Sequence, residues 1–324
     1  MFYSIRHVTR FRYAAPVRES MMELRMHPRS EGMQRCLGFE VSVSPRARLQ
    51  LYRDYLGNVV HHFDVPGPHK QLTITAESSV DVQPLPELPD SCGRDAWPRL
   101  DAEIAQGDFW EMLAPSQFAH WNGNIDAFAE ELGLPEAASA RQSDPLELLT
   151  IVNSRLYAAI EYTPKSTRVD SPVDDALQSR RGVCQDYAHI AIALVRRMGV
   201  PCRYVSGYLF HRDGAKHRSA EGATHAWIEA YLPGVGWVGF DPTNNVLAAD
   251  THVRTAVGRD YADVPPTRGV FKGDASSELT VSVRVARSDK TPPPEAEIAP
   301  EDSYSMAAPD LVDDGQAAAQ QQQQ

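Results

Sequence analysis

Residues 180–209 read RRGVCQDYAHIAIALVRRMGVPCRYVSGYL. After Cys184 the apolar residues recur every three or four positions up to Met198, which predicts a helix with one apolar face. Gly199 and Pro201 are typical of residues that follow the end of a helix. Cys184 is therefore expected at the helix N-terminus, where the helix dipole and unpaired N–H groups stabilise a thiolate. Its backbone N–H would also point toward an oxyanion that forms on an attacked carbonyl.

Residues 224–245 read THAWIEAYLPGVGWVGFDPTNN and predict two strands joined by a turn that contains glycine. His225 lies on the first strand and Asp241 at the end of the second. A cysteine, a histidine and an aspartate are the residue types of a thiol nucleophile, its base and the group that orients the base. Each residue alone has a commoner structural explanation, since buried cysteines are mostly small apolar side chains. The order of these three residues, together with the helix and strands predicted to carry them, favours a catalytic role.

His225 and Asp241 can meet only if they lie on the same face of the sheet. A symmetric four-residue connection, residues 233–236, would pair Asp241 with Ile228 and turn the carboxylate to the opposite face. We therefore predict a connection of odd length or a β-bulge, which the two glycines of this connection permit.

Three segments, GVCQDYAHIAIALVRRMGVPCRYVSGY, THAWIEAY and GWVGFDPTNN, resemble the core motifs of the transglutaminase-like superfamily of papain-type thiol enzymes. The sequence is most similar to the bacterial branch of this superfamily, whose members carry a β-rich N-terminal region. Weaker similarity to that branch runs from residue 1 to about 287. The resemblance implies that Cys184 is the nucleophile, His225 the general base and acid, and Asp241 the residue that orients the imidazole. The cysteine would attack an amide carbonyl, and water or an amine would resolve the thioester.

The resemblance also implies a second donor to the oxyanion, because similar enzymes use an upstream aromatic or polar side chain beside the N–H of the cysteine. Tyr162 is the candidate in the connection before the helix, and Gln185 is the alternative. Trp227 and Trp237 are expected as walls of the cleft or as core residues. Eukaryotic transglutaminases use calcium, but this sequence contains no calcium loop of the D-x-D-x-D-G type. We expect neither a cofactor nor a metal.

The pattern of residues along the chain predicts three regions. Residues 1–95 alternate like strands, are rich in β-branched and aromatic residues, and are expected to form a β-rich N-terminal domain. Residues 96–288 contain the helical patterns and the three motifs and are expected to form the catalytic domain. Residues 289–324 contain TPPPEAEIAPED and AAAQQQQQ, and this low-complexity tail is expected to be disordered.

Composition and charge limit the partners. The 324 residues carry a net charge of −11, but the tail alone has eight acidic residues against Lys290, so the other 288 residues carry only −4. The sequence shows no basic stripe, so we expect no nucleic acid partner. No apolar run reaches the length of a membrane span and residues 1–30 lack a signal-peptide core, so we expect no membrane. The four cysteines show neither a C-x-x-C motif nor zinc spacing, which favours a reducing, cytoplasmic location.

The sequence therefore predicts an α+β fold: a papain- or transglutaminase-like core, with the cysteine at a helix N-terminus packed on an antiparallel sheet, preceded by a β-rich domain. Three functions remain open. The first is hydrolysis of an amide bond in a peptide or protein by a cysteine peptidase or amidase. The second is acyl transfer to an amine, and the third is a binding module that keeps the fold without catalysis. The substrate and the oligomeric state do not follow from the sequence.

Overall fold

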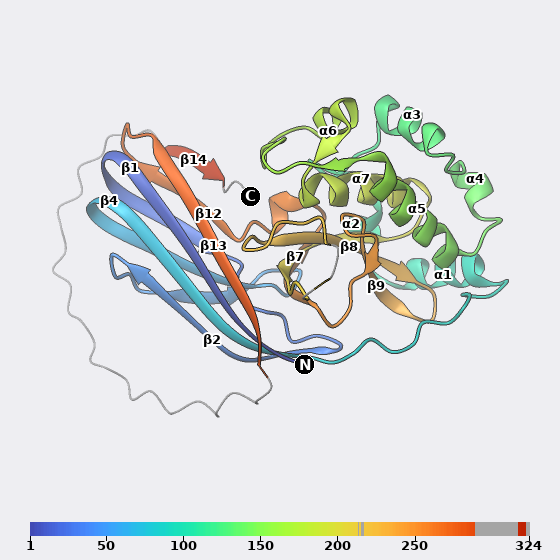
Figure 1. The fold of residues 1–324 in the computed structure, drawn as a ribbon, viewed down its shortest axis with the longest axis horizontal. Helices are drawn as coiled ribbons and strands as arrows, with labels where there is room; N and C mark the ends of the chain where they lie inside the picture. Colours follow the sequence, from blue (N-terminus) through green and yellow to red (C-terminus); the bar gives the residue numbers. More distant parts are fainter. Residues whose placement is uncertain (213, 215–216, 289–316, 322–324) are drawn as a thin grey trace.

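The computed structural model describes residues 1–212, 214, 217–288 and 317–321. Figure 1 shows one lobe made of strands and a second lobe in which helices surround a smaller sheet. Both large sheets are antiparallel, and the helices belong to the second lobe. The predicted α+β class, with a β-rich N-terminal region, is confirmed.

Two long strands form the centre of the first sheet. β1 (Phe2–Leu24) and β4 (Val59–Val82) pair antiparallel along most of their length. Every second residue at the start of β1 is buried, which is the period of a strand with one covered face. β2 (Gln34–Ser44) and β3 (Gln50–Arg53) pair with β4 on its other edge.

Two strands from late in the chain join this first sheet. β12 (Thr267–Lys272) and β13 (Ser277–Ser288) pair with the two halves of β1 (Figure 1). The structure thus differs from the predicted boundary, which assigned residues 96–288 to the catalytic domain. Residues 267–288 alternate like any strand, so their sequence gives no indication of which sheet they join.

The tail also differs in part from its prediction. β14 (Ala317–Gln321) pairs antiparallel with β12 at the edge of the first sheet, so the expected disorder of the tail is wrong for this segment. The N–H and C=O groups on the outer side of an edge strand are available for such pairing. Residues 289–316 and 322–324 lie outside the described part of the chain.

The second lobe contains a five-stranded antiparallel sheet with the order β10-β9-β8-β7-β11. Its strands are β7 (Cys202–Leu209), β8 (His225–Leu232), β9 (Gly236–Asp241), β10 (Val246–Leu247) and β11 (His252–Gly258).

Helix α7 (Cys184–Arg197) packs against this sheet, chiefly on β8. Alternate residues of β8, from Ala226 to Leu232, are buried in the same apolar cluster as the apolar residues of α7. Gly199 follows the helix with a φ of +82°, the left-handed conformation that glycine adopts at helix ends. The helix predicted from the spacing after Cys184 is confirmed.

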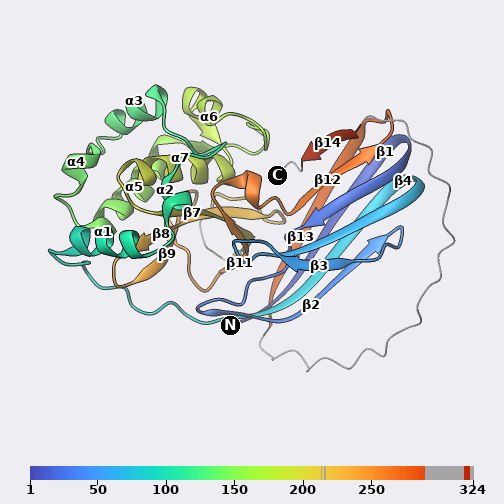
Figure 2. The same cartoon turned by 180° about the vertical axis from the view of Figure 1, so that it is seen from behind.

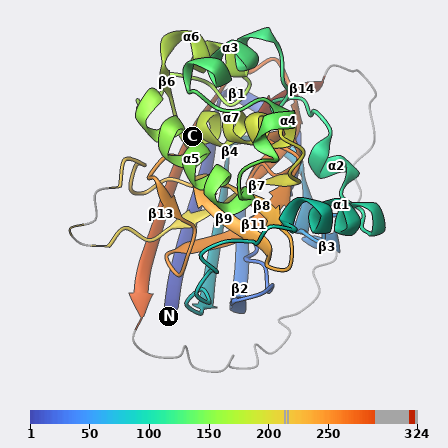
Figure 3. The same cartoon turned by 90° about the vertical axis from the view of Figure 1, so that its right-hand side faces the viewer.

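Helix α7 contacts α2 (Trp110–Leu113), α3 (Gly123–Glu131), α5 (Pro145–Ala159) and α6 (Val173–Ser179), and the other helices lie in the same lobe (Figure 3). Helix α5 begins at Asp144, whose carboxylate accepts hydrogen bonds from the N–H groups of Leu146 and Glu147. The other helices are α1 (Ala96–Gln106), α4 (Ala137–Ala140) and the 3₁₀ helix η1 (Tyr261–Asp263). A small parallel pair, β5 (Glu161–Tyr162) and β6 (Arg181–Gly182), lies just before α7.

Side chains of the first lobe pair with the edge strand β11, which lies next to that lobe in Figure 2. The amide of Asn58 donates to the carbonyl of Val257 and accepts from its N–H, both at 2.9 Å. The amide of Gln34 makes the same two bonds with Arg254, both at 2.8 Å. These amides satisfy the backbone groups of an edge strand and join the two lobes.

None of the four cysteines forms a disulfide. The cytoplasmic location stays a prediction. Among the described residues, no helix combines the length and the apolar character needed to cross a bilayer.

Candidate active site

Cys184 is the first residue of α7, and only 4% of it is exposed. Two residues further on, the Asp186 carboxylate accepts hydrogen bonds from the N–H of Val183 at 2.8 Å and from the hydroxyl of Thr167 at 2.5 Å. Gly182 permits this arrangement, because a Cβ at that position would lie 2.9 Å from the Cβ of Asp186. Burial raises the pKa of Asp186 to about 6. Asp186 therefore fixes the backbone that presents Cys184.

His225 is the first residue of β8 and Asp241 is the last residue of β9. The pairing of the two strands leaves a three-residue connection, residues 233–235, so the predicted odd-length connection is confirmed. If the register continues, Asp241 stands opposite Trp227 and on the same face as His225. The Nε2 of His225 lies 2.7 Å from Oδ2 of Asp241.

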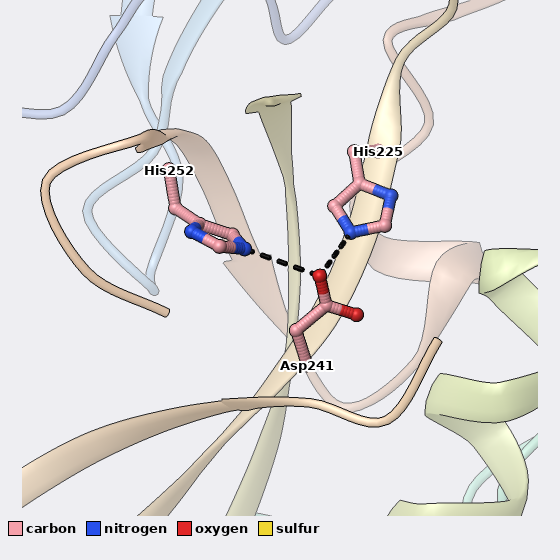
Figure 4. A group of neighbouring side chains, drawn as sticks. All are labelled: His225, Asp241 and His252. Carbon is pink, nitrogen blue, oxygen red and sulfur yellow. Dashed lines mark hydrogen bonds and ion pairs between the residues drawn. The ribbon is translucent and has the colours of Figure 1, made fainter. Parts of the chain in front are cut away.

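Asp241 is fully buried and accepts five hydrogen bonds. Its Oδ1 accepts from the backbone N–H groups of Thr243 at 3.0 Å and Asn244 at 3.3 Å. Its Oδ2 accepts from His225, from the side-chain amide of Asn244 at 2.7 Å, and from Nε2 of His252 at 3.2 Å. Figure 4 shows the two histidines approaching this oxygen from different strands. These donors hold a charged carboxylate in the interior of the lobe.

The charges of His225 and Asp241 stabilise each other. Burial opposes a charge on His225, but the carboxylate of Asp241, its hydrogen bond to the ring and the nearby Cys184 raise the pKa of the imidazole to about 10. Burial also opposes the charge on Asp241, but the attraction of His225 and the donors around it hold its pKa far below its usual range. The stable form of the ring is therefore an imidazolium, with the carboxylate of Asp241 on one side and Cys184 nearby.

Three tyrosines lie near Cys184. Burial, and then the electrostatic effect of the nearby Cys184, raise the pKa values of Tyr162, Tyr204 and Tyr261, that of Tyr162 to about 12. Tyr162 pairs through its backbone with Gly182, two residues before the cysteine. Its hydroxyl oxygen accepts from the N–H of a loop residue at 3.1 Å, so its proton can be donated elsewhere.

The structure gives a different environment to the other expected oxyanion donor. The side-chain amide of Gln185 donates to the carbonyl of Val169 at 2.9 Å. To bind an oxyanion, Gln185 would have to use an amide nitrogen that already donates to Val169. The hydroxyl proton of Tyr162 has no such partner among the hydrogen bonds given above. Both roles stay predictions.

Of the two predicted wall residues, Trp227 lies beside the histidines and Trp237 lies further along the sheet. Trp227 is buried, stacks on His225 with ring centroids 5.9 Å apart, and meets the ring of His252 edge-on at 5.1 Å. Trp237 is partly exposed and lies under the guanidinium of Arg203 at 4.4 Å. Both tryptophans line a cavity of about 330 Å³ whose lining includes His252 but not Cys184.

His225, Asp241 and His252 form a group whose ligand atoms lie within 4.8 Å of one another, as in some metal sites. The fit to a metal is poor, however. Oδ2 of Asp241 already accepts the amide of Asn244 at 2.7 Å, and an amide N–H cannot bind a cation. The contact of 2.7 Å between His225 and Asp241 also matches a charge-assisted hydrogen bond. The donor set therefore fits a hydrogen-bonded carboxylate rather than a metal centre.

Sequence reasoning missed two partners of Asp241. Asn244 lies within the quoted motif, and its side-chain oxygen also accepts from the N–H groups of Arg218 and Ser219 in the loop before His225. His252 lies on β11, and only the folding of the sheet brings it to Asp241. An asparagine after a strand could have been marked as a local hydrogen-bonding residue, but the sequence held no comparable signal for His252.

Comparisons with known proteins agree with this fold. The family model of the bacterial transglutaminase-like N-terminal region matches residues 3–81, and that of the transglutaminase-like superfamily matches residues 133–242. An uncharacterized protein of Mycobacterium leprae (strain TN) is 35% identical over 282 residues, which cover 87% of this chain and 97% of the relative. The fold and these matches define an α+β protein of the papain-type thiol class. The chain belongs to the transglutaminase-like superfamily.

Two further proteins show how far the likeness extends. A protein-glutamine gamma-glutamyltransferase of Pseudomonas aeruginosa is 32% identical over 162 residues, which cover 47% of this chain and 23% of that protein. The crystal structure of a "putative cysteine protease" from Cytophaga hutchinsonii superposes with a TM-score of 0.67 at 22% identity and covers 90% of this chain and 93% of its own. That structural likeness shows the shared fold.

The pKa of His225 predicts how stability depends on pH. A folded-state pKa of about 10, above the ordinary 6.5, means that the protonated ring stabilises the fold fully below pH 6.5 and that this stabilisation is lost as the pH rises through 10. His225→Gln keeps a donor for Asp241 but cannot gain the proton. We expect the difference in unfolding free energy between the wild type and the variant, measured by urea unfolding, to be largest below pH 6.5 and to shrink as the pH rises through 10.

The same pair of proteins in a Cys184→Ala background provides the control. The trend should persist there, because Asp241 contributes more to the pKa of His225 than Cys184 does. A difference in unfolding free energy that does not change with pH would contradict a protonated His225.

Proposed function

We propose that the protein is a thiol-dependent amidase or peptidase that hydrolyses an amide bond of a peptide or protein substrate through a thioester on Cys184. The observation that carries this proposal is the buried imidazole of His225, which is hydrogen-bonded to Asp241 at 2.7 Å and lies close enough to Cys184 for the two side chains to influence each other's charge. This is the arrangement that activates a thiol for attack.

The proposed reaction has two steps. The Cys184 thiolate attacks the amide carbon, and His225 gives its proton to the nitrogen as the C–N bond breaks, which leaves a thioester and a free amine. His225 then takes a proton from water, whose oxygen attacks the thioester. The C–S bond breaks, the substrate leaves as a carboxylic acid, and the thiolate and imidazolium are restored. Asp241 keeps the ring oriented in both steps.

Acyl transfer to an amine is the alternative, because it uses the same thioester. The likeness of 162 residues to a protein-glutamine gamma-glutamyltransferase favours it. The burial of Cys184 and His225 favours hydrolysis, since water reaches a narrow site more easily than the amine of a second protein. The site that supports both reactions is the same, so only the acceptor of the acyl group distinguishes them.

Products formed in oxygen-18 water distinguish the three functions. Glutamine-containing peptides and peptides with an isopeptide bond are incubated with the full-length wild type or with Cys184→Ala, with and without a primary amine. Hydrolysis predicts oxygen-18 in a new carboxylate whether or not the amine is present, and no product with Cys184→Ala. Mass spectrometry of the peptides measures both outcomes.

Two results would contradict the proposal. A predominant amine adduct would support acyl transfer instead. The same absence of products with the wild type and Cys184→Ala, across both peptide classes, would support a binding module.

We further propose that Tyr162 donates to the oxyanion together with the N–H of Cys184. Its hydroxyl oxygen is engaged as an acceptor, and its pKa of about 12 keeps the proton on the phenol. Tyr162→Phe removes only the hydroxyl. We expect turnover of a peptide that the wild type hydrolyses in the oxygen-18 experiment to fall by roughly 10²- to 10³-fold, as for other oxyanion donors. The rate of Cys184 alkylation should not change.

Gln185→Met serves as the comparison, because it removes the second candidate donor at similar volume. If Gln185→Met lowers turnover as strongly and Tyr162→Phe does not, the oxyanion donor is Gln185. If neither variant lowers turnover, the backbone alone supplies the donors.

A further inference from the structure

His252 reaches the proposed site from a strand that is not part of its sequence motifs. It is the first residue of β11, and its side chain is 3% exposed. Its Nε2 lies 3.2 Å from Oδ2 of Asp241, the same oxygen that accepts from His225. Figure 4 shows the two rings approaching this oxygen from different sides, and their centroids are 6.0 Å apart.

The contacts of His252 define its tautomer. The backbone N–H of Ala249 lies 3.3 Å from Nδ1, and an N–H can only donate. Nδ1 must therefore carry the lone pair, and it can also accept from the hydroxyl of Thr251 at 3.2 Å. In the neutral ring the proton then lies on Nε2, which donates it to Asp241.

The surroundings of His252 favour this neutral form. Burial lowers the pKa of His252, and the neighbouring His225 and His217 lower it further, although the bond to Asp241 opposes them. The Trp227 ring packs against the imidazole, nearly perpendicular to it, with the centroids 5.1 Å apart. Asp241 is thus flanked by one charged and one neutral histidine, and only the charged one faces Cys184.

We propose that His252 is a positioning residue: as a neutral donor it holds the Asp241 carboxylate in the orientation that fixes His225. This inference rests on the proposed function of Cys184 and His225. The terminal torsion of an aspartate is soft and roughly two-fold, so the direction of Oδ2 depends on its donors. His252 bonds to that oxygen from β11, whereas Asn244 bonds to it from the turn after β9.

This role extends to the first lobe. Gln34 pairs with both backbone groups of Arg254, two residues after His252, and Asn58 does so with Val257. The strand that carries His252 is therefore held by the N-terminal lobe. The β-rich region would support the site through this strand.

Two amide substitutions test whether His252 donates a hydrogen bond to Asp241. His252→Gln places an amide N–H near the position of Nε2, whereas His252→Asn places its amide near Nδ1 and leaves Asp241 without this donor. Alkylation of Cys184 by iodoacetamide is followed by peptide mass on the full chain. We expect His252→Asn to slow alkylation at pH 6 roughly tenfold, the effect of losing one hydrogen bond to a charged group, and His252→Gln to restore most of the rate.

His69→Asn is the matched control. His69 is a buried histidine of the first lobe with hydrogen bonds to Ser20 and the carbonyl of Gly67. Its loss should lower the melting temperature without changing Cys184 alkylation. Equal slowing by His252→Gln and His252→Asn would overturn the donor role, and so would an alkylation rate that neither variant changes.

Nitrogen-15 NMR of the imidazoles tests the same inference without any reactivity. The spectrum of the wild type, with His252 assigned through His252→Gln, should show a neutral ring protonated on Nε2 between pH 6 and pH 8. A His252 that titrates in this range or carries its proton on Nδ1 would overturn the inference even if Cys184 is reactive. Conversely, an unreactive Cys184 beside a neutral His252 of this tautomer would count against the proposed function alone.

Discussion

The arrangement of the site depends on one buried contact, the 2.7 Å hydrogen bond between His225 and Asp241. A charge in a protein interior is costly unless it is paired and its remaining hydrogen-bonding capacity is satisfied. Here the carboxylate has five donors, and the ring that faces it is charged in turn. The pair is stable in the buried interior because the turn after β9 and the start of β11 donate hydrogen bonds to Asp241, and the loop before β8 donates to Asn244. This requirement explains why segments so far apart in the sequence converge at one oxygen.

The two sheets have different tasks. The five-stranded sheet holds His225, Asp241 and His252, while α7 approaches it with Cys184 at its N-terminus. The first sheet holds neither the cysteine nor the histidines of the site, but its lobe covers the edge of β11 through Gln34 and Asn58. The chain also returns to β1 after the last site residue, through β12 and β13. The first lobe is therefore part of the support of the site rather than a separate appendage.

Local patterns predicted the parts of the site that depend on period and parity. The spacing of apolar residues placed Cys184 at the start of a helix, and the two-residue period of strands required the odd connection found between β8 and β9. The same patterns could not show that His252 meets Asp241, because that contact depends on how the whole sheet curves. They could not assign β12 and β13 to the first sheet either, since a strand records which of its faces is covered but not its neighbour. The hydrogen bond that engages Gln185 depends on a loop whose path has no periodic signal.

The most direct test of the account is the pH dependence of iodoacetamide alkylation at Cys184, compared between the wild type and His225→Ala. The account predicts a reaction midpoint well below about 8.5, the usual value for a thiol, which moves upward when the imidazolium is removed. Cys36 and Cys92 of the same chain provide internal references. A Cys184 that reacts no differently from these two cysteines, or whose midpoint is the same in both proteins, would contradict an activated thiolate and imidazolium pair.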